Sequence, residues 1–246
     1  MRAVMLAAGV GNRLGTATDT PKSLLSFGGR TLLQRHLENL ASLGVTSLTL
    51  CVGYRADLVE AHVENAPLPV RCVRNADYRR GSVLSLWTVR NALACDDDAL
   101  LMDADVLYAP ALLSRLVRSR YANCFLLDEA FVPGDEPVKI CVAEGRIIEF
   151  RKRIAPGLRY DLWGESVGFF KFAPDCARAL AARCETYVEA GRLDEPYEEA
   201  IRDLVVEGRY PLAFEMVAPL PWLEIDFPED LVRARETILP QLDQYP

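Results

Sequence analysis

The alternation of short apolar runs with amphipathic stretches in the first third of the chain limits the folds open to it. Apolar runs typical of buried strands cover Arg2–Leu6, Ser47–Val52 and Val70–Val73. Between them, Thr31–Leu43 and Ala56–Glu64 carry apolar side chains at helical spacing. Strand–helix–strand alternation predicts right-handed βαβ units around a mostly parallel sheet. We therefore expect an α/β protein.

Further along the chain the same rhythm continues and is then interrupted. A helix is expected over Ser82–Leu93, with its first residue as the N-cap, and another over Pro110–Arg118. A strand is expected at Asn123–Leu127. Val138–Val142 and Arg146–Phe150 flank a short turn and predict a hairpin. Because paired strands break the βαβ pattern, we interpret this hairpin as a small insertion into the domain.

Length and charge exclude several classes of protein. The chain has 246 residues, half of them hydrophobic, which suits one ordered domain with a substantial core. Its 28 Lys and Arg residues against 35 Asp and Glu residues give a net charge of −7, which argues against a general nucleic-acid or membrane-surface binder. No run approaches the roughly 18 apolar residues that span a membrane. The chain opens directly with a strand, so no signal peptide is expected.

Cysteines and histidines point away from disulfide, zinc and histidine chemistry. The seven cysteines lack C-x-x-C spacing and lie mostly within apolar segments, which is typical of reduced core residues in a cytoplasmic protein. The two histidines, His36 and His62, fall on the amphipathic helices. Nucleophilic chemistry that depends on a histidine is therefore not expected.

A turn of small residues follows the first strand. It carries Gly9, Gly11 and Gly15, with Arg13 inside the turn and Lys22 after it. Glycines let backbone N–H groups approach phosphate oxygens closely, and the two cations would add to such a site. The lysine stands too far from the glycines for a Walker motif, and a leucine replaces the third glycine of a dinucleotide fingerprint. A tight turn with surface cations would leave the same pattern.

Acidic residues stand where two predicted strands end. Asp103 and Asp105 follow an apolar strand, and the alternation of side chains puts them on one side of it. Ligands of open α/β sheets bind at the carboxyl ends of strands. Two repelling carboxylates favour a cation between them, and oxygen ligands of this kind suit Mg²⁺. A solvated strand end is the alternative.

Near the end of the chain, Glu224 and Asp226 precede the sequence Pro228-Glu229-Asp230. A proline at the first helical position followed by acids is an ordinary helix start. That explanation leaves Glu224 and Asp226 without a role.

These motifs together resemble the signature of the sugar-phosphate and alcohol-phosphate nucleotidyltransferases. The resemblance rests on Leu6-Ala7-Ala8-Gly9, Gly11, Arg13 and Pro21-Lys22, on the D-x-D pair, and on Trp222–Leu231. The last stretch departs from the family pattern only in Phe227, where threonine is usual. The segment Asn75–Trp87 is most similar to the phosphocholine-type cytidylyltransferases. The resemblance covers nearly the whole chain.

For the nucleotide, the resemblance implies a binding set that includes both loop cations. That set is Leu6, Ala7, Ala8, Gly9, Gly11, Asn12, Arg13, Lys22, Asn75, Gly81, Ser82 and Asp103. It further implies that Asp105 and Asp226 hold Mg²⁺, and that Arg13, Lys22 and Lys152 are catalytic. A plain loop and helix cap is the alternative for Asn75, Gly81 and Ser82.

For the acceptor, the resemblance implies a set drawn mainly from the insertion and the strands after it. That set is Asp128, Glu129, Glu136, Lys139, Lys152, Glu165, Gly168, Tyr197 and Glu224. An exposed acidic loop, a solvated basic patch around Lys152, a core strand at Gly168 and a core tyrosine at Tyr197 remain the alternatives.

The resemblance implies a three-layer α/β/α, Rossmann-like (GT-A-like) fold with a mostly parallel mixed sheet and a small β insertion over the acceptor site. We expect one nucleotidyltransferase domain over residues 1–246. Its nucleotide part would cover about residues 1–120 and its acceptor part about 121–235. The expected reaction is Mg²⁺-dependent transfer of CMP from CTP to a phosphorylated alcohol or amino-alcohol, or to a phosphonate, by a possible homodimer. A sugar-1-phosphate uridylyl- or thymidylyltransferase and a non-catalytic nucleotide-binding domain remain open.

Overall fold

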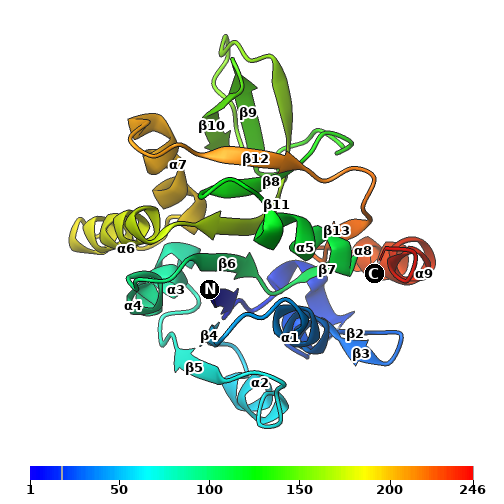
Figure 1. Ribbon diagram of the computed structural model, residues 1–246. Coiled ribbons are helices and arrows are strands. Elements are labelled where there is room, and N and C mark those ends of the chain that lie inside the picture. Colours follow the sequence, from blue (N-terminus) through cyan, green and yellow to red (C-terminus); the bar gives the residue numbers. More distant parts are fainter. Residues whose placement is uncertain (18, 246) are drawn as a thin grey trace.

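The computed structural model describes residues 1–17 and 19–245 and has a central β-sheet between layers of helices (Figure 1). Four parallel strands form one half of the sheet. In spatial order they are β5 (Val70–Arg74), β4 (Leu48–Val52), β1 (Arg2–Ala7) and β6 (Ala99–Asp103). The strand–helix–strand alternation of the sequence is therefore confirmed as a parallel arrangement.

The other half of the sheet is built around one long strand, β11 (Leu162–Phe172), which runs antiparallel to β6. It also pairs antiparallel with β8 (Cys124–Asp128) and with β9 (Lys139–Ala143). β10 (Arg146–Arg151) extends the sheet beyond β9, and β12 (Ala213–Met216) lies parallel to β8. The sheet is thus mixed, as expected.

Side-chain alternation along the strands creates two cores. On β1, Val4 joins one cluster of buried side chains, whereas Ala3 and Met5 join the other. The first face is covered by α3 (Ser82–Thr88), α4 (Arg90–Leu93), α6 (Pro174–Glu189) and α7 (Tyr197–Glu207). The second face is covered by α1 (Leu32–Ser42), α2 (Ala56–His62) and α5 (Pro110–Arg118). The expected three-layer α/β/α arrangement is confirmed.

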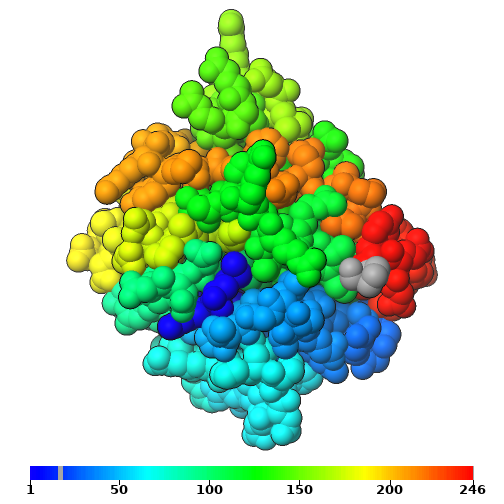
Figure 2. Space-filling view, viewed as in Figure 1, coloured from blue at the N-terminus to red at the C-terminus, as the bar shows by residue number. Residues whose placement is uncertain are grey.

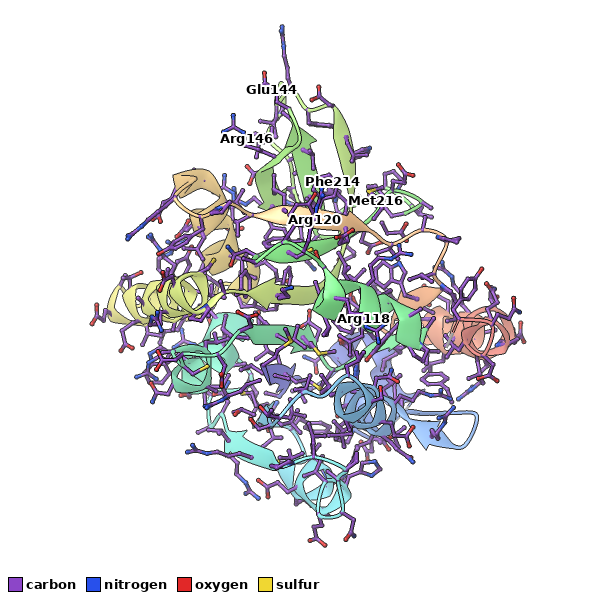
Figure 3. The ribbon with its side chains drawn as sticks, viewed as in Figure 1. Arg118, Arg120, Glu144, Arg146, Phe214 and Met216 are labelled. Carbon is purple, nitrogen blue, oxygen red and sulfur yellow. The ribbon has the colours of Figure 1, made fainter. Side chains whose placement is uncertain are left out.

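The hairpin of β9 and β10 projects from the body of the molecule (Figures 1 and 2). Its turn contains Glu144 and Gly145, both with positive φ, as a two-residue hairpin turn requires. Figure 3 shows Glu144 and Arg146 at the outer end of this hairpin, while Phe214 and Met216 lie on β12. The base of the hairpin leads into the loop 129–138 on one side and into Lys152 on the other.

A short antiparallel pair brings the two acidic motifs together. β7 (Val106–Tyr108) pairs with β13 (Trp222–Glu224), in a register that sets Glu224 opposite Val106. The N–H of Ile225 then donates to the carbonyl of Asp105 at 3.0 Å. Residues more than a hundred positions apart are thereby fixed at the same edge of the sheet. α8 (Pro228–Arg233), the π-helical segment η3 (Ala234–Ile238) and α9 (Leu239–Leu242) pack behind this pair.

One predicted helix is wrong in detail. The stretch expected as a single helix from Ser82 to Leu93 is divided into α3 and α4 at Val89. The N-cap of α3 is Gly81, and the Ser82 hydroxyl instead accepts a hydrogen bond from the N–H of Tyr197 at 2.9 Å. Ser82 therefore ties α3 to the start of α7. Among the described residues, no helix has the length and apolarity needed to cross a membrane.

Candidate active site

The glycine turn lines a small cavity at the carboxyl end of β1. Gly11 has a φ of +71°, and a Cβ at this position would approach Cγ of Lys22 to 3.2 Å. Glycine therefore allows both the turn and the close passage of the lysine side chain. The cavity, of about 90 Å³, is lined by Leu6, Ala7, Gly9, Gly11, Lys22, Ser23, Ala104 and Asp105. Ala8 is buried beneath the turn, and Asn12 begins the 3-10 turn that carries Arg13.

The ammonium of Lys22 lies between two carboxylates. Its Nζ is 2.9 Å from Oδ2 of Asp105 and 2.6 Å from Oδ1 of Asp226. Burial by itself would lower the pKa of Lys22, but the two carboxylates outweigh it, and the pKa is raised above its ordinary value. Burial would raise the pKa of Asp226, yet Lys22 and Arg13 hold it below its ordinary value. Lys22 and Asp226 are therefore both charged near neutral pH.

Glu224 adds a third carboxylate to this cluster. One oxygen each from Asp105, Glu224 and Asp226 lie within 4.8 Å of one another. Burial, followed by the charge of Asp105, raises the pKa of Glu224 well above its usual range. Closely spaced carboxylate oxygens are the donors that Mg²⁺ takes from proteins. The donor set therefore fits a hard divalent cation.

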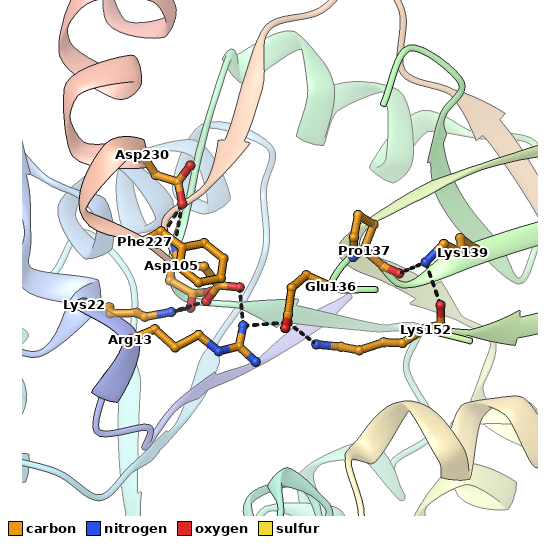
Figure 4. A network of polar contacts seen from close by, with 10 residues as sticks. Arg13, Lys22, Asp105, Glu136, Pro137, Lys139, Lys152, Phe227 and Asp230 are labelled. Atoms are coloured by element: carbon orange, nitrogen blue, oxygen red, sulfur yellow. Dashed lines mark hydrogen bonds and ion pairs between the residues drawn. The ribbon is translucent and has the colours of Figure 1, made fainter. Parts of the chain in front are cut away.

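Arg13 and Lys152 meet at one carboxylate, that of Glu136 (Figure 4). Nη1 of Arg13 lies 2.8 Å from Oε2 of Glu136, and Nζ of Lys152 lies 3.3 Å from the same oxygen. Arg13 also donates to Oδ2 of Asp226 at 3.0 Å. The network therefore runs from the glycine turn to the end of β10. We call the carboxylates of Asp105, Glu136, Glu224 and Asp226 the acidic centre. Arg13, Lys22 and Lys152 all contact it.

Lys139 is buried and faces backbone carbonyls. Its ammonium donates to the carbonyl of Pro137 at 3.0 Å, to that of Lys152 at 2.6 Å, and to that of Gly134. An ammonium has three N–H donors, so these bonds use all of them. The side chain thus has no donor left for a bound acceptor. It connects the loop before β9 to the residue after β10.

Asp103 lies beneath the acidic centre in a tightly packed site. The hydroxyl of Tyr197 donates to Oδ2 of Asp103 at 2.6 Å, with Tyr197 buried and Asp103 partly exposed. Gly168, with a φ of +78°, faces the same oxygen, and a Cβ there would lie 2.4 Å from it. Burial raises the pKa of Asp103 well above its ordinary value. Glycine at 168 therefore leaves the space that the Asp103 carboxyl occupies.

The three residues expected near the base all have partners within the protein. The Asn75 amide donates to Ser85 Oγ at 3.1 Å and accepts from the N–H of Asp77 at 2.9 Å. A Cβ on Gly81 would lie 2.2 Å from the carbonyl oxygen of Glu195, so this glycine permits contact with the loop before α7. Ser82 also contacts that loop, through Tyr197. Packing explains these residues, and base contact stays a prediction.

A larger cavity opens beside the acidic centre, with a volume of about 410 Å³. Its lining is rich in acids and aromatic rings: Asp128, Ala130, Phe131, Val132, Glu136, Pro137, Glu165, Trp222, Leu223, Glu224, Asp226, Phe227, Asp230 and Arg233. Asp128 accepts from the indole N–H of Trp222 at 2.7 Å. Burial, followed by the charge of Asp128, raises the pKa of Glu165 to about 7. The neighbouring Glu129 is exposed.

Three charged lining residues, Glu198, Asp230 and Arg233, are absent from the set expected from the sequence. Glu198 lines a narrow cavity together with Asp103, Lys152 and Tyr197. Its Oε2 is buried without a hydrogen-bond partner among the described residues. Burial raises the pKa of Glu198. The sequence gives little sign of this role, because acids are ordinary in the first turn of a helix and Glu198 stands in the first turn of α7. Its one signal is its position next to Tyr197.

Comparison with known proteins finds relatives that match nearly the whole of this chain but differ in their own length. A bifunctional IPC transferase and DIPP synthase of Rubrobacter xylanophilus is 30% identical over 96% of this chain and 52% of its own length. A CMP-5'-(3-aminopropyl)phosphonate synthase of Streptomyces rubellomurinus is 29% identical over 99% of this chain and 40% of its own length. The chain thus spans about half, or less, of these two relatives. A UTP–glucose-1-phosphate uridylyltransferase of Haloferax volcanii is 28% identical over 99% of both chains.

Solved structures share the fold. An inositol-1-phosphate CTP transferase from T. maritima superposes with a TM-score of 0.79 at 22% identity, over 99% of this chain and 95% of that protein. The sequence model of the MobA-like NTP transferase domain matches residues 3–187, well over half of the chain. That match covers the glycine turn, the D-x-D pair and β11. This chain therefore belongs to the MobA-like NTP transferase domain family.

Proposed function

We propose that this protein is a Mg²⁺-dependent cytidylyltransferase. It transfers CMP from CTP to a small phosphorylated alcohol or amino-alcohol, or to a phosphonate, and releases pyrophosphate. The observation that carries the proposal is the convergence of the glycine turn, Lys22, Asp105 and Asp226 at one edge of the sheet. The names of two similar proteins, one a CMP-phosphonate synthase and the other a CTP transferase, support the choice of nucleotide and acceptor class.

The N-terminal part, about residues 1–120, would bind the nucleotide. The backbone of Gly9 and Gly11 would face the triphosphate, and Arg13 and Lys22 would neutralise its charge. Ala8, Asn12, Asn75, Gly81, Ser82 and Asp103 are proposed as the surrounding walls, on the side of the ribose and the base. The hydrogen bonds of Asn75, Ser82 and Asp103 would help to hold these walls rigid.

Asp105 and Asp226 would hold the Mg²⁺, with Glu224 beside them. When bound, the ion would withdraw negative charge from the phosphate that reacts. Lys22, which contacts both carboxylates at less than 3 Å, would then lie next to that phosphate. Positioning and electrostatic stabilisation are the two contributions that this arrangement offers to phosphoryl chemistry.

The acceptor would enter from the side of the insertion, in the part covering about residues 121–235. Lys152 would orient its phosphate or phosphonate oxygen, which is already ionised near neutral pH and needs no general base. That oxygen would form a bond to the α-phosphorus of CTP as the bond from this phosphorus to the bridging oxygen breaks. Pyrophosphate would leave with that bonding electron pair, held by Arg13.

The large cavity is proposed to hold the rest of the acceptor. Asp128, Glu165 and Glu224 line it, and Gly168 and Tyr197 lie in the adjoining narrow cavity. Lys139 is proposed as a positioning residue, because its donors are used by carbonyls. Glu129 would contribute only at the exposed rim. The seven unpaired cysteines suit a reducing compartment, and we propose a cytoplasmic enzyme.

A uridylyltransferase acting on a sugar 1-phosphate is the second candidate. The relative from Haloferax volcanii favours it, since the similarity covers nearly all of both chains. The acceptor distinguishes the two candidates. The first would use a phosphorylated alcohol, an amino-alcohol phosphate or a phosphonate, and the second would use a hexose 1-phosphate.

The test is pyrophosphate release from CTP, UTP, dTTP, ATP and GTP, each with and without Mg²⁺. Acceptors would be phosphocholine, phosphoethanolamine, 2-aminoethylphosphonate, inositol 1-phosphate, glycerol phosphate and glucose 1-phosphate. Turnover with CTP and a non-hexose acceptor, lost on chelation of Mg²⁺ and in Asp105→Asn, is the expected result. Asp57→Asn, on the exposed start of α2, is the matched control and should keep activity. A preference for UTP or dTTP with glucose 1-phosphate would establish the second candidate instead.

A further inference from the structure

Glu136 reaches from the insertion to the glycine turn and is shared by two cations. The loop that carries it connects β8 to β9, while Arg13 belongs to the turn after β1. Both Arg13 and Lys152 contact the same oxygen, Oε2, at 2.8 and 3.3 Å (Figure 4). One anionic oxygen therefore bridges two positive groups that arise from opposite sides of the site.

Glu136 also lies where the cavities meet. It lines both the cavity of about 410 Å³ beside Trp222 and the narrow cavity that contains Lys152 and Tyr197. Its side chain is about half exposed, at 49%, and that of Arg13 is 43% exposed. Exposed ion pairs of this kind are weak and screened by salt. The contact is thus one that a doubly charged anion can replace.

The loop of Glu136 is fixed on the Lys152 side. Lys139 donates to the carbonyl of Pro137, the residue after Glu136, and to the carbonyl of Lys152 itself. The backbones of Glu136 and Lys152 are thereby held together through one buried ammonium. Only the contact between Glu136 and Arg13 joins the insertion to the glycine turn within this network. Loss of that contact would leave Arg13 with its other carboxylate partner, Asp226 at 3.0 Å, without disturbing the insertion.

We propose that Glu136 is an internal anion that competes with substrate phosphate groups for Arg13 and Lys152. The inference rests on the proposed function, in which these two cations bind the triphosphate and the acceptor phosphate. The carboxylate occupies a position between the two cations, and an incoming phosphate oxygen must replace it there. A released carboxylate still faces the site and repels an anion. Glu136 thereby lowers the affinity for anionic ligands.

The test measures the binding of inorganic pyrophosphate by isothermal titration calorimetry in a buffer that contains a metal chelator. Glu136→Gln keeps the shape of the side chain and removes its charge, and Glu136→Ala removes both. Asp135→Asn is the matched control, since it makes the same charge change one residue away. Asp135 is 78% exposed and pairs only with Arg153, at 3.6 Å, among the described ion pairs. Thermal unfolding would verify that each variant is folded.

Both Glu136 variants should bind pyrophosphate about fivefold more tightly than the unaltered protein, a size typical of exposed ion pairs. Asp135→Asn should change binding by less than half of that. The gain should shrink at high salt, where the ion pairs are screened. Unchanged or weaker binding in both Glu136 variants would overturn the proposal, as would an equal gain in Asp135→Asn. Turnover is measured separately, so absence of CTP turnover would refute the proposed function without deciding this comparison.

Discussion

Lys22 and Asp226 form the shortest ion pair of the acidic centre, with 2.6 Å between Nζ and Oδ1. The lysine follows the glycine turn, and the aspartate follows β13 at the other end of the chain. The ammonium stands among the carboxylates that are proposed to hold Mg²⁺. A positive side chain and a metal ion would therefore compete for the same negative charge.

Lys22→Met should separate metal binding from turnover. Without the ammonium, the carboxylates of Asp105 and Asp226 should bind Mn²⁺ about tenfold more tightly in the absence of nucleotide. Turnover should fall by about 10² to 10³-fold, because charge on the reacting phosphate loses its partner. Electron paramagnetic resonance of free Mn²⁺ and pyrophosphate release are the two measurements. Mn²⁺ affinity that is unchanged or lower would contradict the competition.

Gly168→Ala should destabilise the fold and disturb Asp103. The new Cβ would lie 2.4 Å from Oδ2 of Asp103 and would also adopt a φ of +78°. Gly145→Ala provides the control, since Gly145 has a φ of +73° but nothing within 4 Å of its Cβ position. Backbone strain of about 1 kcal/mol, the cost of a side chain at positive φ, is common to both substitutions. Gly168→Ala should lose a further 1–3 kcal/mol, roughly, through the clash. Equal losses in urea unfolding would show that Asp103 moves away freely.

Stability should fall with rising pH through Glu165. Its folded pKa of about 7 exceeds the ordinary value, because burial and Asp128 disfavour the charged form. The folded state therefore holds a proton that the unfolded chain releases. The resulting stability is complete below pH 4.5 and is lost as the pH rises to about 7. Urea unfolding of Glu165→Gln, compared with the unaltered protein, should show a difference on the order of 2 kcal/mol that develops over this interval. If the difference in unfolding free energy between the two proteins did not change with pH, the raised pKa of Glu165 would be contradicted.

Local pattern was enough to predict the elements whose ends carry their own signals. α5 spans Pro110–Arg118, the range expected, because a proline at its first position and an amphipathic repeat define it. The hairpin turn was marked by Glu144-Gly145. The division of α3 from α4 at Val89 was not foreseen. Apolar spacing continues through both helices, so the sequence pattern does not reveal a one-residue interruption.

The site depends on long-range pairing that residue types alone do not specify. Asp105 and Asp226 meet because β7 pairs with β13 across more than a hundred residues. Resemblance to a known signature anticipated that meeting, whereas composition and periodicity did not. For Lys139 the resemblance suggested a contact with the acceptor. In the structure its ammonium donates to three backbone carbonyls instead. Whether a lysine faces solvent, substrate or backbone is decided by the packing of distant elements.

Lys139 and Lys152 provide the final prediction, because the same substitution should affect them in opposite ways. Lys139→Met would leave three carbonyl oxygens without their donor, including that of Lys152. A fully buried acceptor without a partner costs about 1–3 kcal/mol. These contacts are only partly buried and Gly134 is exposed, so the free energy of unfolding should fall by roughly 1–2 kcal/mol in all. Lys152 is 39% exposed, so Lys152→Met should change stability by about 0.5 kcal/mol at most.

Lys139→Met should cause the larger loss of stability, whereas Lys152→Met should cause the larger loss of activity. Lys152→Met should lower kcat/KM for the acceptor by about 10²-fold while leaving the KM for CTP near its original value. Lys139→Met, assayed well below its Tm, should raise the KM for the acceptor and retain most of kcat, because Lys152 is present but less firmly held. Urea unfolding and initial rates at varied acceptor concentration provide both comparisons. A loss of turnover in Lys139→Met as large as that in Lys152→Met, without loss of stability, would mean that Lys139 contacts the acceptor directly.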